Sequence, residues 1–149
     1  MSGWPEARID AVARLRALAA GLPHVVLAEC VLEAPFERVW AIVGDLERGV
    51  PRFEANVSAA RITAREGDRL VLEARHPLGP RVRFDVVLQP GYCVMRARFA
   101  DVGMAAVAEP GGLRTRLAHY EGSRPLGRLA WPLLRRNIRA DFAALRRLL

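Results

Sequence analysis

The chain has 149 residues, of which 52% are hydrophobic and 26% charged, with 12 glycines and 10 prolines. This length and apolar content fit one globular domain that needs no disulfide or metal for its core, and they exclude a largely disordered chain. All 23 basic residues are arginine, so lysine-imine chemistry and a lysine-linked pyridoxal cofactor are excluded.

We expect neither a membrane span nor a secretory leader from this sequence. No run of about 18 apolar residues occurs, and Asp10, Arg14 and Arg16 interrupt the apolar residues near the start. Two cysteines far apart, Cys30 and Cys93, do not form the pattern of a disulfide framework. We therefore expect a cytoplasmic protein.

The net charge of +7 is concentrated near the C-terminus. Residues 122–149 carry seven arginines and one aspartate, and the rest of the chain is almost neutral. Arginines on one side of the last helix could meet RNA or an anionic lipid, but a solvated helix face is the better interpretation. Because aromatic residues are few and mostly fall on core positions, nucleic acid is not expected as a partner.

The elements expected along the chain begin with an amphipathic helix over residues 6–20. Pro5 suits its first turn, and Gly21 and Pro23 end it. Residues 24–33, rich in Val and Leu, predict a strand. The remaining expected elements are a helix at 35–43, a short helix or turn at 45–52, strands at 55–65, 69–76, 81–88, 92–100, 102–108 and 113–121, and a long helix at 126–149.

This order predicts an α+β fold. Turn signals every 8–12 residues indicate a continuous antiparallel meander, which packs its apolar face on the helices. We expect residues 1–23 to form an N-terminal helix and linker, and residues 24–149 to form the main domain. The apolar stripe of the first helix predicts docking on its own domain or in a homodimer; its members are Ile9, Val12, Leu15 and Ala19.

Alternation with a period of two gives four successive strands one apolar face and one arginine-rich face. The long helix has a matching apolar stripe, so the sheet and helix should close over an apolar interior. The residues expected to line a ligand cavity there are Leu72, Phe84, Met95, Thr115, Leu117, Asn137, Ile138 and Phe142.

Four ionisable residues also fall on the inner face: His76, His119, Glu121 and Asp141. An inward carboxylate beside an inward histidine is a usable acid–base pair. The competing interpretation places these residues near strand ends, paired with arginines at the rim. His119 is the best candidate base; burial would lower its pKa and a carboxylate would raise it, so the sign stays open.

Other chemistries find little support. The histidines, His24, His76 and His119, show no metal-ligand spacing, and His24 is expected to be exposed. The two cysteines fall on inward positions and predict inert thiols, and no serine elbow or glycine-rich nucleotide loop occurs. We expect neither a metal nor a cofactor.

The segment from Val31 to Trp40, with Ala34-Pro35 leading into a helix, resembles the opening of the SRPBCC (START-like) superfamily, as do the stretch from Thr115 to Glu121 and the closing helix. The resemblance covers residues 24–149. It implies a helix-grip fold, in which a curved antiparallel sheet of six or seven strands wraps around a long C-terminal helix. The helix before the first strand is an addition to that pattern.

The resemblance also implies a function, because members bind lipids, sterols, polyketides or hormones, and some cyclise or dehydrate a bound substrate. No catalytic motif is shared across the superfamily. Three hypotheses follow: binding of an apolar small molecule between sheet and helix, a polyketide cyclase or dehydratase with a pocket histidine as base, and a protein- or membrane-surface adaptor without stable membrane insertion.

Overall fold

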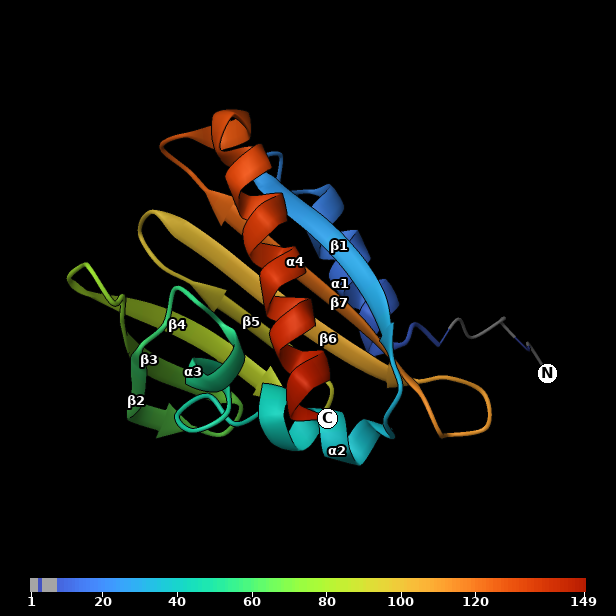
Figure 1. Cartoon of the computed structure of the whole chain (residues 1–149). Coiled ribbons are helices and arrows are strands. Elements are labelled where there is room, and N and C mark those ends of the chain that lie inside the picture. The colour runs from blue at the N-terminus through green and yellow to red at the C-terminus, as the bar shows by residue number, and fades with distance from the viewer. Residues whose placement is uncertain (1–2, 4–7) are drawn as a thin grey trace.

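The computed structural model describes Gly3 and residues 8–149, and its main element is one seven-stranded antiparallel sheet (Figure 1). The strand order is β1-β7-β6-β5-β4-β3-β2. The strands are β1 (Val25–Leu32), β2 (Ala59–Glu66), β3 (Arg69–Arg75), β4 (Arg81–Gln89), β5 (Tyr92–Arg96), β6 (Ala100–Ala108) and β7 (Thr115–Ser123). The helices are α1 (Ala11–Ala20), α2 (Phe36–Val43), α3 (Val50–Phe53), the 3-10 helix η1 (Gly127–Ala130) and α4 (Trp131–Leu148).

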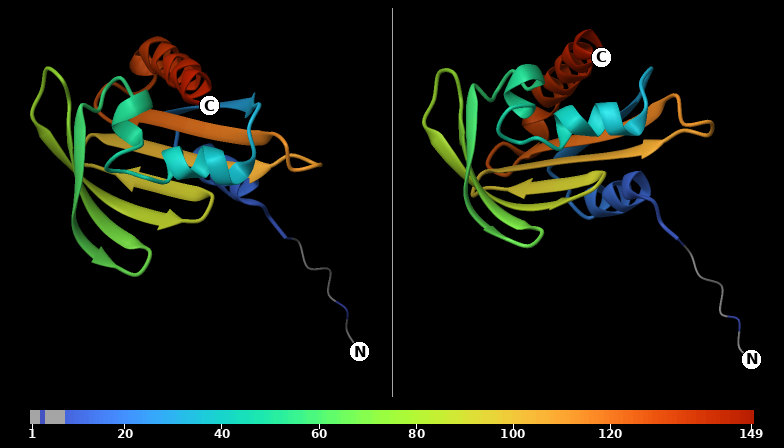
Figure 2. Two further views of the ribbon diagram at one scale, coloured as in Figure 1. Left: turned by 60° about the horizontal axis from the view of Figure 1, so that its bottom comes forward. Right: turned by 90° about the horizontal axis from the view of Figure 1, so that it is seen from below.

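The helices lie on both faces of the curved sheet. Helix α4, with α2 and α3, lies on the face that we call inner, and α1 lies on the opposite, outer face (Figure 2). The predicted helix-grip α+β fold is therefore confirmed, including the extra N-terminal helix. No helix within residues 8–149 is long and apolar enough to cross a bilayer.

The inner face carries the main hydrophobic core, as the period-two pattern predicts. Leu72 on β3 lies opposite Phe84 on β4 in the strand register, and both are buried. Helix α4 contributes Ile138, Phe142 and Leu145 to the same cluster. Burying each such side chain stabilises the fold by about 1.5–3 kcal/mol relative to exposure, so this face holds the sheet and α4 together.

Helix α1 docks on the outer face of its own domain. Val12, Leu15 and Ala19 are buried in a second hydrophobic cluster with residues of β1, β5, β6 and β7. The prediction for Ile9 is wrong, because this side chain is 65% exposed. The helix begins at Ala11 because Asp10 is its N-cap and accepts a hydrogen bond from the Ala13 N–H.

The start predicted for this helix lies outside the described residues, apart from 8–10, which are not helical. At its other end, the helix stops at Ala20 as predicted. The guanidinium of Arg16 forms an ion pair with Glu29 on β1, which adds a polar contact between α1 and the outer face of the sheet.

One predicted strand, residues 92–100, is divided in the structure. Strand β5 ends at Arg96 and β6 begins at Ala100, with a tight turn between them. The guanidinium of Arg124 donates hydrogen bonds to the carbonyl oxygens of Ala97 and Arg98, so a distant side chain stabilises this turn. Nothing in the local sequence signals it, because the turn contains neither glycine nor proline.

Candidate functional site

A cluster of four ionisable side chains lies inside the domain. Strand β7 contributes His119 and Glu121, which are two positions apart and therefore point to the same, inner face. Asp141 comes from α4, which lies over this face, and Glu54 follows the last residue of α3. All four residues are buried, with at most 7% of their surface exposed.

The imidazole of His119 is the centre of this cluster. Its Nε2 atom lies 3.1 Å from Asp141 Oδ2, 3.4 Å from Glu121 Oε1 and 3.8 Å from Glu54 Oε1. One ligand atom from each of the four residues lies within 4.8 Å of the others. The fold thus brings three carboxylates to one nitrogen atom.

The other imidazole nitrogen fixes the orientation of the ring. His119 Nδ1 lies 3.0 Å from the carbonyl oxygen of Gly103 on β6, and since a carbonyl only accepts, Nδ1 carries the proton and donates it. Position 103 requires glycine, because the Tyr120 ring packs against its backbone and a Cβ there would lie 2.3 Å from that ring.

Burial and mutual charge shift the pKa values of the cluster. Burial raises the pKa of Glu54 to about 8, against the opposing attraction of His119. Burial also raises the pKa of Asp141, although hydrogen bonding to His119 opposes the shift. Burial alone would lower the pKa of His119, but hydrogen bonds to Asp141 and Glu121 and the nearby carboxylate charges hold it well above its usual range.

The predicted residues are only partly brought together. His119, Glu121 and Asp141 meet, but His76 lies in the connection between β3 and β4, where its Nδ1 accepts a hydrogen bond from the Leu78 N–H. Asn137 is half-buried on α4, outside the four-residue cluster.

The interpretation that pairs the inward carboxylates with rim arginines is wrong, because among residues 8–149 no arginine forms an ion pair with Glu121 or Asp141. His24 also differs from expectation. It is mostly buried, and its Nε2 lies 2.6 Å from Asp101 Oδ2.

Sequence reasoning missed Glu54 entirely. This residue follows a one-turn helix and precedes an irregular segment, so no periodicity assigns its side chain to either face. It reaches the cluster because α3 packs against α4. Its Oε1 atom is buried without a hydrogen-bond partner in the structure.

Most of the residues predicted to line an inner cavity are buried in the main hydrophobic core or beside it. Leu72, Leu117 and Ile138 are each at most 1% exposed, so they do not border a space wide enough for water. Thr115 is also fully buried, and its hydroxyl donates a 2.7 Å hydrogen bond to the Ala34 carbonyl. Phe84, Met95 and Phe142 belong to the same cluster.

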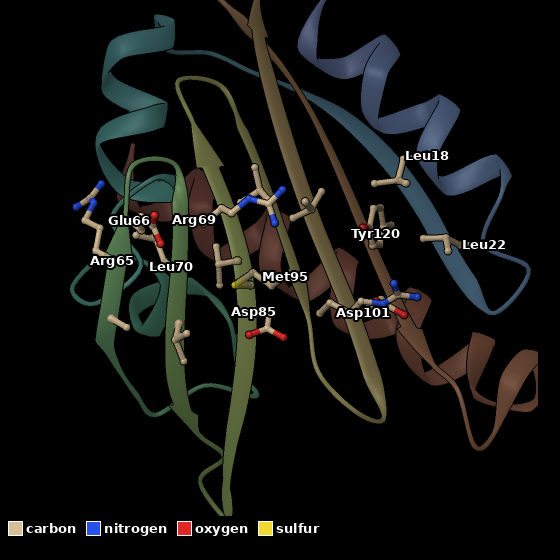
Figure 3. A pocket seen from close by; sticks show the side chains of 16 residues that line it. Leu18, Leu22, Arg65, Glu66, Arg69, Leu70, Asp85, Met95, Asp101 and Tyr120 are labelled. Atoms are coloured by element: carbon tan, nitrogen blue, oxygen red, sulfur yellow. The ribbon is translucent and has the colours of Figure 1, made fainter.

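An open groove of about 690 Å³ lies instead on the outer face, beside α1 (Figure 3). The strands contribute apolar side chains that alternate along the chain with the inner-face residues. Helix α1 and the residues after it form one wall of the groove. These lining residues include Leu18, Leu22, Val71, Val87, Val94 and Tyr120.

Charged side chains surround this groove. Arg65 and Glu66 lie at the end far from Leu18 and Leu22, the side chain of Arg69 extends toward the middle of the groove, and Asp85 lies between the two ends (Figure 3). The carboxylate of Asp101 already has partners within the protein, because it pairs with Arg124 and His24. Arg65 and Arg69 form no ion pair with any residue in the described part of the chain.

The arginines of the C-terminal helix form no comparable site. Arg128 and Arg135 lie over the Trp131 ring, with guanidinium carbons 5.2 and 5.5 Å from its centroid. Arg139 and Arg146 are exposed to solvent. This arrangement agrees with the solvated helix face that the sequence favours.

No protein-family profile and no curated protein matches the sequence of this chain. Solved structures do match its fold. The protein XoxI from Bacillus cereus is 14% identical, with a TM-score of 0.67 over 84% of this chain and 94% of its own. Zhui aromatase/cyclase from Streptomyces sp. R1128 is 15% identical, with a TM-score of 0.62 over 82% of this chain and 90% of its own.

A START superfamily protein from Mycobacterium smegmatis is 17% identical, with a TM-score of 0.61 over 85% of this chain and 99% of its own. These three likenesses establish a START-like fold for the chain. At such low identity they establish nothing further about its ligand or activity.

Proposed function

We propose that this START-like chain binds a small amphipathic molecule, an apolar body with an acidic group, in the groove on the outer face of its sheet. The observation that carries the proposal is the groove itself. Its volume of about 690 Å³ is typical of ligand sites, and its lining is mainly apolar with a few polar groups.

The acidic group of the ligand is inferred from two arginines that line the groove. Arg65 and Arg69 have no ion-pair partner among the described residues, and Arg69 extends over the neighbouring strands (Figure 3). A guanidinium binds a carboxylate through two parallel hydrogen bonds. A long-chain or polycyclic carboxylic acid fits this site, because its apolar body can pack on Val71, Val87 and Val94 and its carboxylate can bind the arginines.

The inner face is the competing location. Binding there, beside Leu72 and Phe84, would require α3 and α4 to move away from the sheet, because these side chains are already packed. That opening costs the free energy of their apolar contacts. The outer groove requires no such opening, which favours it as the binding site.

A cyclase or dehydratase is the second candidate function, favoured by the fold shared with the Zhui aromatase/cyclase. The raised pKa of His119 disfavours the role of general base, since a protonated imidazole has no lone pair at Nε2 to accept a proton. A role as proton donor to a leaving hydroxyl agrees with the geometry, provided that the interior opens.

Two half-buried valines of the same strand separate the two locations. Val87 lines the outer groove and Val82 packs against the inner core, so Val87→Trp and Val82→Trp add the same bulk on opposite faces of β4. Binding of cis-parinaric acid, a fluorescent fatty acid, is measured for both variants, with circular dichroism to verify folding.

We expect Val87→Trp to weaken the binding of the probe at least tenfold and Val82→Trp to leave it unchanged. The reverse pattern assigns the ligand to the inner face and overturns the outer site. Absence of saturable binding in the unaltered protein overturns the binding function for this class of ligand. Arg69→Gln tests whether the ligand needs an acidic group. We expect this substitution to weaken the binding of cis-parinaric acid more than it weakens the binding of the corresponding alcohol.

A further inference from the structure

The cluster of Glu54, His119, Glu121 and Asp141 places three carboxylates inside an apolar core with one imidazole, and no arginine among the described residues pairs with them. Among the described residues, each ion pair of these carboxylates is with His119 alone. Unbalanced buried charge is costly, so such groups are paired, protonated or bound to a metal. The chain contains 23 arginines, yet no described arginine pairs with these carboxylates.

The orientation of His119 gives the first argument for a cation. Its Nδ1 donates to the Gly103 carbonyl, which leaves Nε2 facing the three carboxylates. With a lone pair, Nε2 would repel the carboxylate oxygens, so the site requires either a proton on Nε2 or a metal cation in its place. Histidines that bind metals have this same arrangement, with the second ring nitrogen held by a backbone carbonyl or carboxylate.

Glu54 gives an independent argument. Its side chain is more than nine-tenths buried, and its Oε1 atom lacks a hydrogen-bond partner while pointing into the cluster, 3.8 Å from His119 Nε2. A buried polar atom without a partner costs about 1–3 kcal/mol. Coordination of a cation would satisfy this oxygen together with those of Glu121 and Asp141.

The spacing between the imidazole nitrogen and the three carboxylate oxygens fits a small cation. Donors at about 2.1 Å from a tetrahedral metal lie about 3.4 Å from one another. The three distances from Nε2 to the carboxylate oxygens, 3.1, 3.4 and 3.8 Å, are close to this spacing. We propose that Glu54, His119, Glu121 and Asp141 bind one divalent first-row transition metal ion.

The donor types narrow the choice of metal. An imidazole nitrogen suits zinc, iron, nickel and copper, and carboxylates suit manganese and magnesium, so the mixed set fits zinc or manganese. Calcium takes six to eight oxygen ligands at longer distances and is disfavoured here. Three carboxylates and one divalent ion leave a net charge of −1. The side chain of Glu121, at 10% exposed, is the most exposed of the four.

The experiment uses full-length protein stripped with EDTA and then titrated with Zn²⁺, with binding followed by calorimetry and stability by thermal unfolding. Glu54→Gln is the main variant, because the amide keeps the shape of the side chain and breaks no hydrogen bond of Oε1. His119→Gln removes the nitrogen ligand. His24→Gln is the matched control, since it removes a histidine that lies outside the cluster beside Asp101.

We expect one Zn²⁺ per chain, a rise in Tm on binding, and no rise with Mg²⁺ or Ca²⁺. Glu54→Gln and His119→Gln should weaken Zn²⁺ binding at least tenfold, and His24→Gln should leave it unchanged. In EDTA, Glu54→Gln should unfold at the same or a higher temperature than the unaltered protein, and in Zn²⁺ at a lower one. The proposal is overturned if the unaltered protein shows no saturable Zn²⁺ binding, or if Glu54→Gln binds Zn²⁺ as tightly as the unaltered protein does. Protons, and not a metal ion, would then balance the charge of the carboxylates.

Discussion

His119 on β7 and Asp141 on α4 are 22 residues apart in sequence, yet His119 Nε2 and Asp141 Oδ2 lie 3.1 Å apart in the interior. Both residues are at most 2% exposed. This polar contact, with Glu54 and Glu121 beside it, joins the last strand to the C-terminal helix within a mainly apolar interface.

The first prediction concerns this pair. In protein stripped with EDTA, Asp141→Ala should lower the free energy of unfolding by about 1–3 kcal/mol, because the buried Nε2 of His119 loses its 3.1 Å hydrogen-bond partner. Urea unfolding followed by circular dichroism measures the loss. Glu33→Ala is the control, since its exposed carboxylate lies 3.9 Å from Arg114 and contributes little. Equal losses in both variants would contradict a structural contribution of the pair.

The second prediction concerns the docking of α1. Leu15 is fully buried against the outer face, whereas Leu18, one turn away, is 38% exposed. Leu15→Ala should therefore cost about 3 kcal/mol of unfolding free energy and Leu18→Ala less than about 1 kcal/mol. Thermal and urea unfolding compare the two variants.

The same docking makes a prediction about assembly. Because α1 covers its own sheet, deletion of residues 1–21 should lower Tm without changing the oligomeric state, as measured by light scattering after gel filtration. A change in mass on deletion would support the alternative, in which the helix docks in a homodimer.

The third prediction compares two threonine hydroxyls that donate to backbone carbonyls. Thr115 Oγ1 bonds the Ala34 carbonyl in the core at 2.7 Å, and Thr63 Oγ1 bonds the Val71 carbonyl at the surface at 3.3 Å. Thr115→Val should cost about 1–3 kcal/mol because it leaves a buried carbonyl without a donor, and Thr63→Val should cost less than about 0.5 kcal/mol. Similar losses would mean that burial of the Ala34 carbonyl does not matter.

The fourth prediction concerns the two thiols. Burial raises the pKa of Cys30 to about 11 and that of Cys93 to about 12. A raised pKa lowers the thiolate fraction, so alkylation by iodoacetamide should be slow at pH 8 and accelerate as pH rises toward 11. Cys30 should react before Cys93, which is only 3% exposed. Mass spectrometry of partially labelled protein gives both rates.

Denatured protein is the reference for this measurement. Unfolding removes the burial that raises both pKa values, so the two cysteines should then react at similar, faster rates at pH 8. Rapid labelling of Cys93 in the folded state at pH 8 would show that the inner core opens on the time scale of the reaction.

The sequence by itself determined the sheet, the two principal helices and their buried faces. Alternation along β3, β4 and β7 is a local property, because successive side chains of a strand must point to opposite faces. The stripe containing Ile138 and Phe142 follows equally from the helical period. These patterns also identified His119, Glu121 and Asp141 as inward residues, as the structure shows.

Only the tertiary structure decided which inward groups meet and where open space remains. Glu54 reaches the cluster through the packing of a one-turn helix, and Arg124 stabilises a turn between β5 and β6 from a distant strand end. The groove arises where the docked α1 leaves part of the outer sheet uncovered, while helices cover the inner face. Period and composition report the direction of a side chain, but contacts and cavities depend on distances between elements far apart in the chain, which no local pattern contains.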